Sequence, residues 1–145
     1  MHILMCNDDG ILADGLRHLA SYLSQYYRIT VVAPANEQSA KSHALTTEVP
    51  LKLDACNGED ENPRLYALTG TPSDCMKFGL SYLLTDDMPD LVISGINHGF
   101  NLGSDVLYSG TVSAAMESCF YGIPGLALSV ERYSAERGDE MHPFI

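Results

Sequence analysis

The chain has 145 residues, of which 46% are hydrophobic, so length and composition indicate one globular domain and exclude a disordered segment or a fibre. Eight lysine and arginine residues against 19 aspartate and glutamate residues give a formal net charge of −11. This acidic balance argues against nonspecific binding to nucleic acid polymers or to an anionic membrane surface. Because no apolar stretch approaches the roughly 20 residues of a membrane-spanning helix, no membrane association is expected.

The N-terminus and the cysteines predict a cytoplasmic protein. The chain leads directly into a strand-like segment, 2–6, without the basic and small-residue signals of a secretory leader. There is no Cys-x-x-Cys pair among the four cysteines, which are Cys6, Cys56, Cys75 and Cys119. Since they stand mostly among apolar residues, we expect them to be reduced thiols of the core.

Apolar periodicity in the first half of the chain alternates between short strand-like runs and longer helical runs. The first strand is expected over 2–6 and the second over 29–33. The helix between them has its apolar residues on one face, at Leu16, Leu19, Ala20 and Leu23. A polar loop and a weakly alternating extended stretch, 45–53, follow, and the acidic segment 57–63 is expected to be a surface turn.

The second half begins with a strand over 64–69 and a helix that Ser73 or Asp74 is expected to cap. The buried face of that helix is expected to hold Cys75, Gly79, Leu80 and Leu83. The continuous apolar run 91–94 is typical of a parallel strand covered on both faces.

A loop rich in glycine and asparagine, 95–108, leads to a helix over about 111–121 and a last strand over 125–129. The alternation of strands and helices indicates an open α/β sheet with right-handed crossovers. Beyond it, 131–140 is polar and 142–145 ends on apolar residues, as expected of a piece of a longer protein. We therefore expect a core domain over 1–130 and the truncated start of a C-terminal region over 131–145.

Polar groups follow four of the expected strands at their carboxyl ends. Asp8 and Asp9 follow the first strand and Ser39 lies in the loop after the second. The segment 70–72 follows the third strand and Asn97 follows the fourth. Because ligands of open α/β sheets bind beyond the carboxyl ends of the strands, we expect these loops to meet at one rim.

The adjacent carboxylates of Asp8 and Asp9 would repel each other by on the order of 4 kcal/mol at about 4 Å and an effective dielectric of about 20. Either one keeps its proton or a cation lies between them. With neutral oxygens from Ser39 and Asn97, the set suits Mg²⁺ or Mn²⁺ better than zinc. The alternative is that one aspartate caps a helix while the other is solvated. A calcium repeat is disfavoured because the loop 97–105 is a single copy without a bidentate glutamate.

Ser109, Gly110 and Thr111 stand immediately before the helix at 111–121. Their hydroxyls and backbone N–H groups could hold a phosphate without any basic residue, and an ordinary helix cap is the alternative. His43, after the Ser39 loop, could hydrogen-bond a phosphate or its leaving group, or could have a structural role.

Five segments occur together in the order found in one known family: Asn7-Asp8-Asp9-Gly10-Ile11, Val32-Ala33-Pro34 with Ser39-Ala40, Gly70-Thr71-Pro72-Ser73-Asp74-Cys75, Ser94-Gly95-Ile96-Asn97 and Asp105-Val106-Leu107-Tyr108-Ser109-Gly110-Thr111-Val112. From residue 3 to about 130 the chain closely resembles the SurE family of survival proteins, which are 5′-nucleotidases.

This resemblance implies a Rossmann-like α/β fold, with an open, mostly parallel sheet, helices on both faces and the C-terminal part missing. It implies a phosphatase that uses one divalent metal ion, Mg²⁺ or Mn²⁺, and hydrolyses nucleoside 5′-monophosphates, in some members also 3′-monophosphates and short polyphosphate. The family's metal ligands match Asp8, Asp9, Ser39 and Asn97, and the two aspartates are the expected catalytic residues. Its phosphate-side residues match Asn101 and the turn Ser109-Gly110-Thr111.

The chain departs from the family pattern in two respects. Ser118 follows Glu117 where the family usually has glycine. The family's C-terminal portion, which forms an arm exchanged between subunits, is absent, so a homodimer or tetramer is expected only of a full-length form. The alternative function is a truncated, noncatalytic fragment that binds a nucleotide or phosphate. A receiver-like domain is disfavoured because no aspartate follows the strand at 64–69 and no lysine follows the strand at 125–129.

Overall fold

The computed structural model describes residues 1–131 and contains one six-stranded sheet. Its strands are β1 (His2–Cys6), β2 (Arg28–Pro34), β3 (Leu53–Ala55), β4 (Arg64–Leu68), β5 (Leu91–His98) and β6 (Gly125–Val130). They are arranged in the order β3-β4-β2-β1-β5-β6, and every neighbouring pair is parallel except β3 and β4. The predicted C-terminal region lies outside the described residues apart from Glu131, so the boundary at residue 130 stays a prediction.

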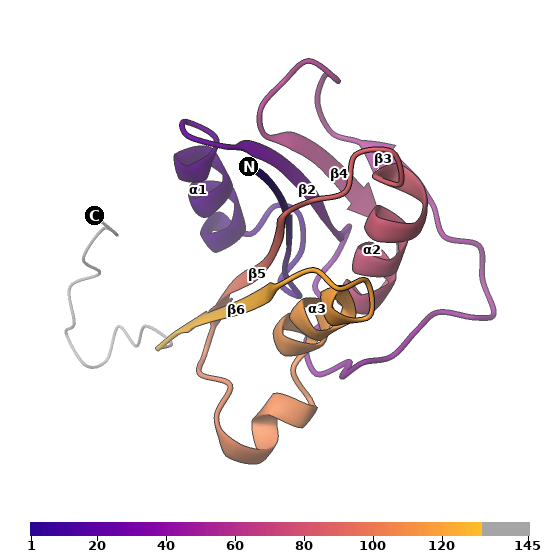
Figure 1. Cartoon of the computed structure of the whole chain (residues 1–145). Helices are drawn as coiled ribbons and strands as arrows, with labels where there is room; N and C mark the ends of the chain where they lie inside the picture. The colour runs from indigo at the N-terminus through magenta and orange to yellow at the C-terminus, as the bar shows by residue number, and fades with distance from the viewer. Residues whose placement is uncertain (132–145) are drawn as a thin grey trace.

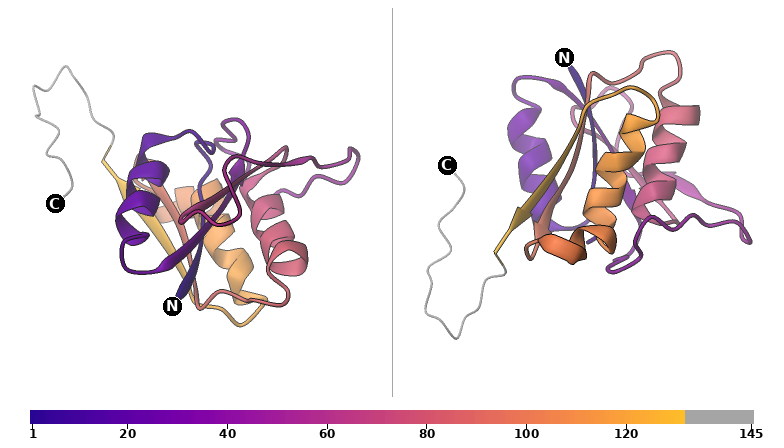
Figure 2. Two further views of the ribbon diagram at one scale, coloured as in Figure 1. Left: turned by 90° about the horizontal axis from the view of Figure 1, so that it is seen from above. Right: turned by 60° about the horizontal axis from the view of Figure 1, so that its bottom comes forward.

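Helices cover both faces of the sheet, as expected. They are α1 (Asp14–Leu23), α2 (Pro72–Phe78) with a π-helical turn (Gly79–Leu83), a 3₁₀ helix (Gly103–Leu107) and α3 (Gly110–Cys119). Helix α1 lies on one face, and α2 and α3 lie side by side on the other (Figures 1 and 2). Within residues 1–131, no helix is long and apolar enough to cross a membrane.

Alternate residues of β1 point into the two halves of the core. Ile3 and Met5 pack in the cluster beneath α1, whereas Leu4 and Cys6 pack in the cluster beneath α2 and α3. All five β1 residues are buried. A strand buried on both faces holds its carboxyl end rigidly, so the residue that follows it, Asn7, is fixed by the core.

The N-terminus of α2 differs from the prediction of Ser73 or Asp74 as its cap. Thr71 is the N-cap, and its hydroxyl accepts a hydrogen bond from the Asp74 N–H at 3.1 Å. The Asp74 carboxylate accepts in return from the Thr71 N–H at 2.9 Å. This reciprocal pair is a capping box, in which Asp74 is the third helical residue and not the cap.

Two strands also differ in extent from the prediction. Of the extended stretch 45–53, only its last residue is in a strand, the short antiparallel edge strand β3. Strand β5 continues past the predicted end at Ser94 to His98, with a bulge between Ser94 and Asn97 where it pairs with β6. Pairing with a neighbouring strand decides both ends, and weak local alternation does not carry that information.

All four cysteines are free thiols, but only two of them are in the core. Cys6 and Cys75 are buried, as predicted, and burial raises the pKa of the Cys75 thiol. Cys56 and Cys119 are exposed, so the prediction of a core position is wrong for both. Cys56 directly follows an edge strand and Cys119 ends α3, positions where an apolar neighbour in sequence does not imply burial.

Candidate active site

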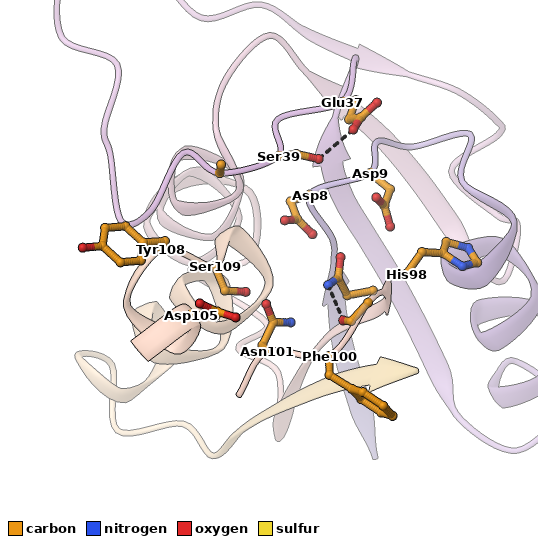
Figure 3. A pocket seen from close by; sticks show the side chains of 13 residues that line it. Asp8, Asp9, Glu37, Ser39, His98, Phe100, Asn101, Asp105, Tyr108 and Ser109 are labelled. Atoms are coloured by element: carbon orange, nitrogen blue, oxygen red, sulfur yellow. Dashed lines mark hydrogen bonds between the residues drawn. The ribbon is translucent and has the colours of Figure 1, made fainter. Parts of the chain in front are cut away.

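A cavity of about 490 Å³ opens at the carboxyl ends of β1, β2 and β5 (Figure 3). Six of the predicted site residues line it: Asp8, Asp9, Ser39, Asn97, Asn101 and Ser109. Four predicted positions do not line it: His43, the segment 70–72, Gly110 and Thr111. Three of the four expected loops therefore meet at this rim, while 70–72 turns away to cap α2.

The turn after β1 is shaped by Asn7 and Gly10. The Asn7 side chain donates to the Gly10 carbonyl at 3.0 Å and accepts from the Gly10 N–H at 3.2 Å. Gly10 has φ +100, a conformation that residues with a side chain rarely adopt. The turn places Asp8 and Asp9 directly over the strand end, facing the cavity (Figure 3).

Asp8 is buried and is held by the N-terminus of α3. The Thr111 hydroxyl donates to Asp8 Oδ1 at 2.5 Å. The second carboxylate oxygen, Oδ2, takes no part in this hydrogen bond. A Cβ on Gly110 would lie only 2.8 Å from the Asp8 Cβ, so α3 can approach Asp8 this closely only with glycine there. Gly110 and Thr111 thus position Asp8, although neither is among the residues that line the cavity.

The carboxylate of Asp9 has an oxygen that no hydrogen-bond donor satisfies. Its Oδ2 atom is buried and has no hydrogen-bond partner within the part of the chain that the structure describes. Burial and then the charge of Asp8 raise the pKa of the Asp9 carboxyl, and Glu37 adds to this while His98 opposes it. A carboxylate with one unpartnered buried oxygen beside a second carboxylate needs either a proton or a cation.

Ser39 and Asn97 present the neutral oxygens that the sequence predicted. The Ser39 hydroxyl donates to Glu37 Oε1 at 2.7 Å, so its lone pairs are left for another partner. The Asn97 amide nitrogen donates to the Gly99 carbonyl at 2.8 Å, which leaves its carbonyl oxygen available.

These oxygens and the two aspartates fit a hard divalent cation such as Mg²⁺ or Mn²⁺. The unpartnered Asp9 Oδ2 is the observation that supports this fit. Residues 1–131 contain no group of three or more histidine, cysteine, aspartate or glutamate side chains that could hold a metal ion. The candidate set differs from such a group because only two of its four members, the aspartates, are of these residue types.

The opposite wall of the cavity carries the predicted phosphate-side residues. The Ser109 hydroxyl accepts from the Val112 N–H at 3.1 Å, so Ser109 is the N-cap of α3. The Asn101 amide nitrogen donates to Ser129 Oγ at 2.7 Å. Among the described residues that line the cavity there is no lysine or arginine.

His43 belongs to a different part of the surface. Its Nε2 atom lies 2.7 Å from Glu117 Oε2, and it lines a separate cavity of about 680 Å³ with Leu45, Lys77, Glu117, Phe120 and Tyr121. The contact with Glu117 fits the structural role considered for His43, and His43 is not among the residues that line the cavity of Asp8 and Asp9.

Seven residues that line the cavity were not predicted as site residues: Glu37, Ala40, His98, Gly99, Phe100, Asp105 and Tyr108. Glu37 and Ala40 could have been found from their places beside Ser39 in the sequence. The other five lie in the loop 95–108, whose conformation the sequence left open. The Phe100 ring points away from the two aspartates (Figure 3).

Comparison with known proteins gives consistent similarities over most of the chain. The profile of a family described as survival protein SurE matches residues 3–144. Two proteins named 5′-nucleotidase SurE, from Thermoanaerobacter sp. (strain X514) and Vibrio vulnificus (strain YJ016), are 54% and 50% identical over 129 and 130 residues. These matches cover 89% and 90% of this chain but only 50% and 49% of the relatives.

A solved structure described as the crystal structure of Sure protein from Aquifex aeolicus is similar in fold, with a TM-score of 0.77 and 43% identity. It matches 89% of this chain, which covers 50% of that protein. The chain thus spans about half the length of the curated relatives it matches.

Proposed function

Because this chain belongs to the SurE family of survival proteins, we propose that it is a metal-dependent phosphatase that hydrolyses nucleoside 5′-monophosphates to nucleoside and phosphate. Nucleoside 3′-monophosphates and short polyphosphate are proposed as further substrates. The observation that carries the proposal is the buried, unpartnered Asp9 Oδ2 beside Asp8, in a cavity whose described lining has no lysine or arginine. Such a site can attract a phosphate dianion only after a cation has joined it.

Asp8, Asp9, Ser39 and Asn97 would hold one Mg²⁺ or Mn²⁺ ion. When bound, that ion would neutralise phosphate oxygens and lower the pKa of a water molecule. The Thr111 hydroxyl keeps Asp8 in place through its 2.5 Å hydrogen bond.

On the opposite wall, the N-terminus of α3 and the side chains of Asn101 and Ser109 are proposed to bind the phosphate. The aligned peptide dipoles of this ten-residue helix favour negative charge at its first turn. The Asn101 amide uses one N–H toward Ser129 and has a second one for a phosphate oxygen. Donors fixed by the fold stabilise charge that develops on the equatorial oxygens during transfer.

Two routes for the transfer fit this arrangement. In the first, a water oxygen bonds to phosphorus as the ester bond breaks, and the nucleoside oxygen receives a proton. In the second, an Asp8 oxygen bonds to phosphorus as the ester bond breaks and the nucleoside oxygen receives a proton, and water then hydrolyses the aspartyl phosphate to free Asp8 and phosphate. Acid quenching with radiolabelled substrate separates them, because only the second leaves label on the protein.

The test of the proposed function is release of phosphate from a nucleoside 5′-monophosphate with and without added Mg²⁺ or Mn²⁺. We expect turnover that depends on the cation and is lost in Asp9→Asn. The matched control is Asp14→Asn, an exposed carboxylate on α1 outside the cavity, which should turn over normally. Nucleotide binding without turnover by the wild-type chain would instead favour the noncatalytic fragment, because the chain spans only half the length of its relatives.

Two broader properties are part of the proposal. A full-length form with the C-terminal region is proposed to be a homodimer or tetramer. The cytoplasm is proposed as the compartment, because all four cysteines are free thiols.

A further inference from the structure

Three residues after Ser39, the same loop is hydrogen-bonded to the segment that precedes α3. The Ser42 hydroxyl donates to the Leu107 carbonyl at 2.8 Å, and the Ser42 N–H donates to the Tyr108 carbonyl at 3.1 Å. The next residue, His43, places Nε2 at 2.7 Å from Glu117 Oε2. We call these contacts of Ser42 and His43 with Leu107, Tyr108 and Glu117 the latch.

The contact between His43 and Glu117 is unlike an ordinary surface ion pair. The Glu117 side chain is only 7% exposed, whereas the side chains of the surface pair Lys52 and Asp54 are 73% and 55% exposed. A surface pair contributes little because water screens it. Among residues 1–131, His43 is the side chain that bonds the Glu117 carboxylate. Loss of the partner of a buried carboxylate costs much more than loss of a surface pair, so the His43 contact resists opening.

The backbone between Ser39 and the latch is held in an unfavourable conformation. Ala40 has φ +57 and Ser42 has φ +54, and both residues carry a Cβ. Residues with a Cβ are unfavourable in this left-handed region, and they persist there only where surrounding contacts fix them. The latch supplies such contacts on one side, and the Gln38 N–H supplies one on the other by donating to the Asp8 carbonyl at 2.7 Å.

We propose that the latch is a positioning device: Ser42 and His43 hold the Ser39 hydroxyl against Asp8 and Asp9 and thereby set the affinity for the divalent cation without touching it. Ser39 lies between two anchors, Gln38 on the β1 side and Ser42 on the α3 side. Release of either anchor lets the loop relax from its strained conformation and moves the Ser39 oxygen. This inference rests on the proposed function, because it assigns Ser39 to the cation.

The first test is amide hydrogen exchange in the metal-free protein. The Gln38 amide reports directly whether the loop stays docked on Asp8. We expect the double variant S42A/H43A to exchange Gln38 about tenfold faster or more, because local opening becomes easier. H43Q keeps an N–H donor for Glu117 and should remain near the wild-type rate. The control is Ser24→Ala, which removes another serine hydroxyl bond to a carbonyl, at 2.8 Å and outside the cavity.

The second test is calorimetric titration of the same variants with Mn²⁺. The double variant should bind about tenfold more weakly, in the range seen when residues that support metal ligands are removed. H43Q should recover most of the affinity, and Ser24→Ala should be unchanged.

The two tests separate the failure of the latch from that of the metal site. If the wild-type chain binds Mn²⁺ and S42A/H43A matches it in affinity or in Gln38 exchange, the latch is overturned and the proposed function stands. If the wild-type chain binds no Mn²⁺, the metal site is overturned, together with the role of the latch in cation affinity.

Discussion

Asp9 lines the cavity and has a carboxylate oxygen without a hydrogen-bond partner in the described part of the chain. This oxygen, Oδ2, is buried, and burial and Asp8 raise the pKa of the Asp9 carboxyl. A carboxyl with a raised pKa favours the folded state only while it is protonated. That contribution is lost as pH rises from the unfolded value, about 3.8, through the folded pKa. At neutral pH, where the unfolded chain has ionised Asp9, the raised pKa of this carboxyl therefore lowers the stability of the metal-free protein.

Asp9→Asn should consequently have opposite effects on the metal-free and metal-bound protein. Without metal, we expect the variant to melt at a higher temperature at pH 7, because the unpaired charge is removed. With saturating Mn²⁺, the wild-type protein should gain stability by mass action and the variant should gain little. Thermal denaturation with and without Mn²⁺ measures both effects. A full Mn²⁺-dependent gain in Asp9→Asn would contradict the assignment of Asp9 as a ligand.

Ala40 is a second position where local backbone and residue type conflict, because it has φ +57. Replacement by glycine removes the Cβ clash but raises the entropy of the unfolded chain, so Ala40→Gly should increase the free energy of unfolding by about 1 kcal/mol. Urea denaturation measures this change. The same substitution at Ala55, an exposed residue in β3, should decrease the free energy of unfolding by roughly 0.5–1 kcal/mol. Equal effects at the two positions would show that the backbone at Ala40 is not strained.

At the scale of elements, the periodicity of apolar residues predicted the bounds of the central strand β1 but not those of the edge strand β3. Strand β1 matches its predicted bounds because its apolar residues are buried in the core clusters on alternate faces of the sheet. The cap of α2 was misassigned because threonine, serine and aspartate at 71, 73 and 74 all suit an N-terminus, and only the reciprocal bond identifies Thr71. The length of β3 depends on its pairing with β4, which no local pattern contains.

The amino end of β1 predicts a dependence of stability on pH. His2 is only 3% exposed, and its Nε2 lies 2.9 Å from the Thr30 hydroxyl oxygen. Burial and then the charge of Arg28 lower the pKa of His2, while Asp87 opposes this shift. The unfolded chain therefore binds the proton first as pH falls below about 6.5. Stability should decrease from that pH down to the folded pKa and be unaffected by His2 above it.

Urea denaturation between pH 7.5 and 5.5 measures this slope. His2→Gln should flatten it, even if the variant is less stable throughout. His18→Gln, which changes an exposed histidine of α1, should keep the wild-type slope. An unchanged slope in His2→Gln would mean that other groups cause the acid sensitivity.

At the scale of the whole molecule, six of the predicted site residues lie together in one cavity because parallel strands bring their carboxyl ends to one rim. The positions of Thr111 and His43 depend on contacts between distant segments. Thr111 bonds to Asp8 across 103 residues, and His43 bonds to Glu117 across 74 residues. A hydroxyl before a helix and a histidine in a loop look alike whether they face a ligand or a carboxylate of the protein, so the sequence left these roles open.

The distribution of charge gives the central claim its most direct test. With a net charge of −11 and no lysine or arginine in the described lining of the cavity, the proposed cation would be the principal receptor for the phosphate. The decisive measurement is equilibrium binding of a nucleoside 5′-monophosphate to the wild-type chain, in excess chelator and again in Mg²⁺. We predict that chelation abolishes binding as well as turnover, because the empty aspartate pair repels the phosphate. Comparable affinity in the two conditions would contradict this account and would identify the N-terminus of α3 or a protein cation as sufficient.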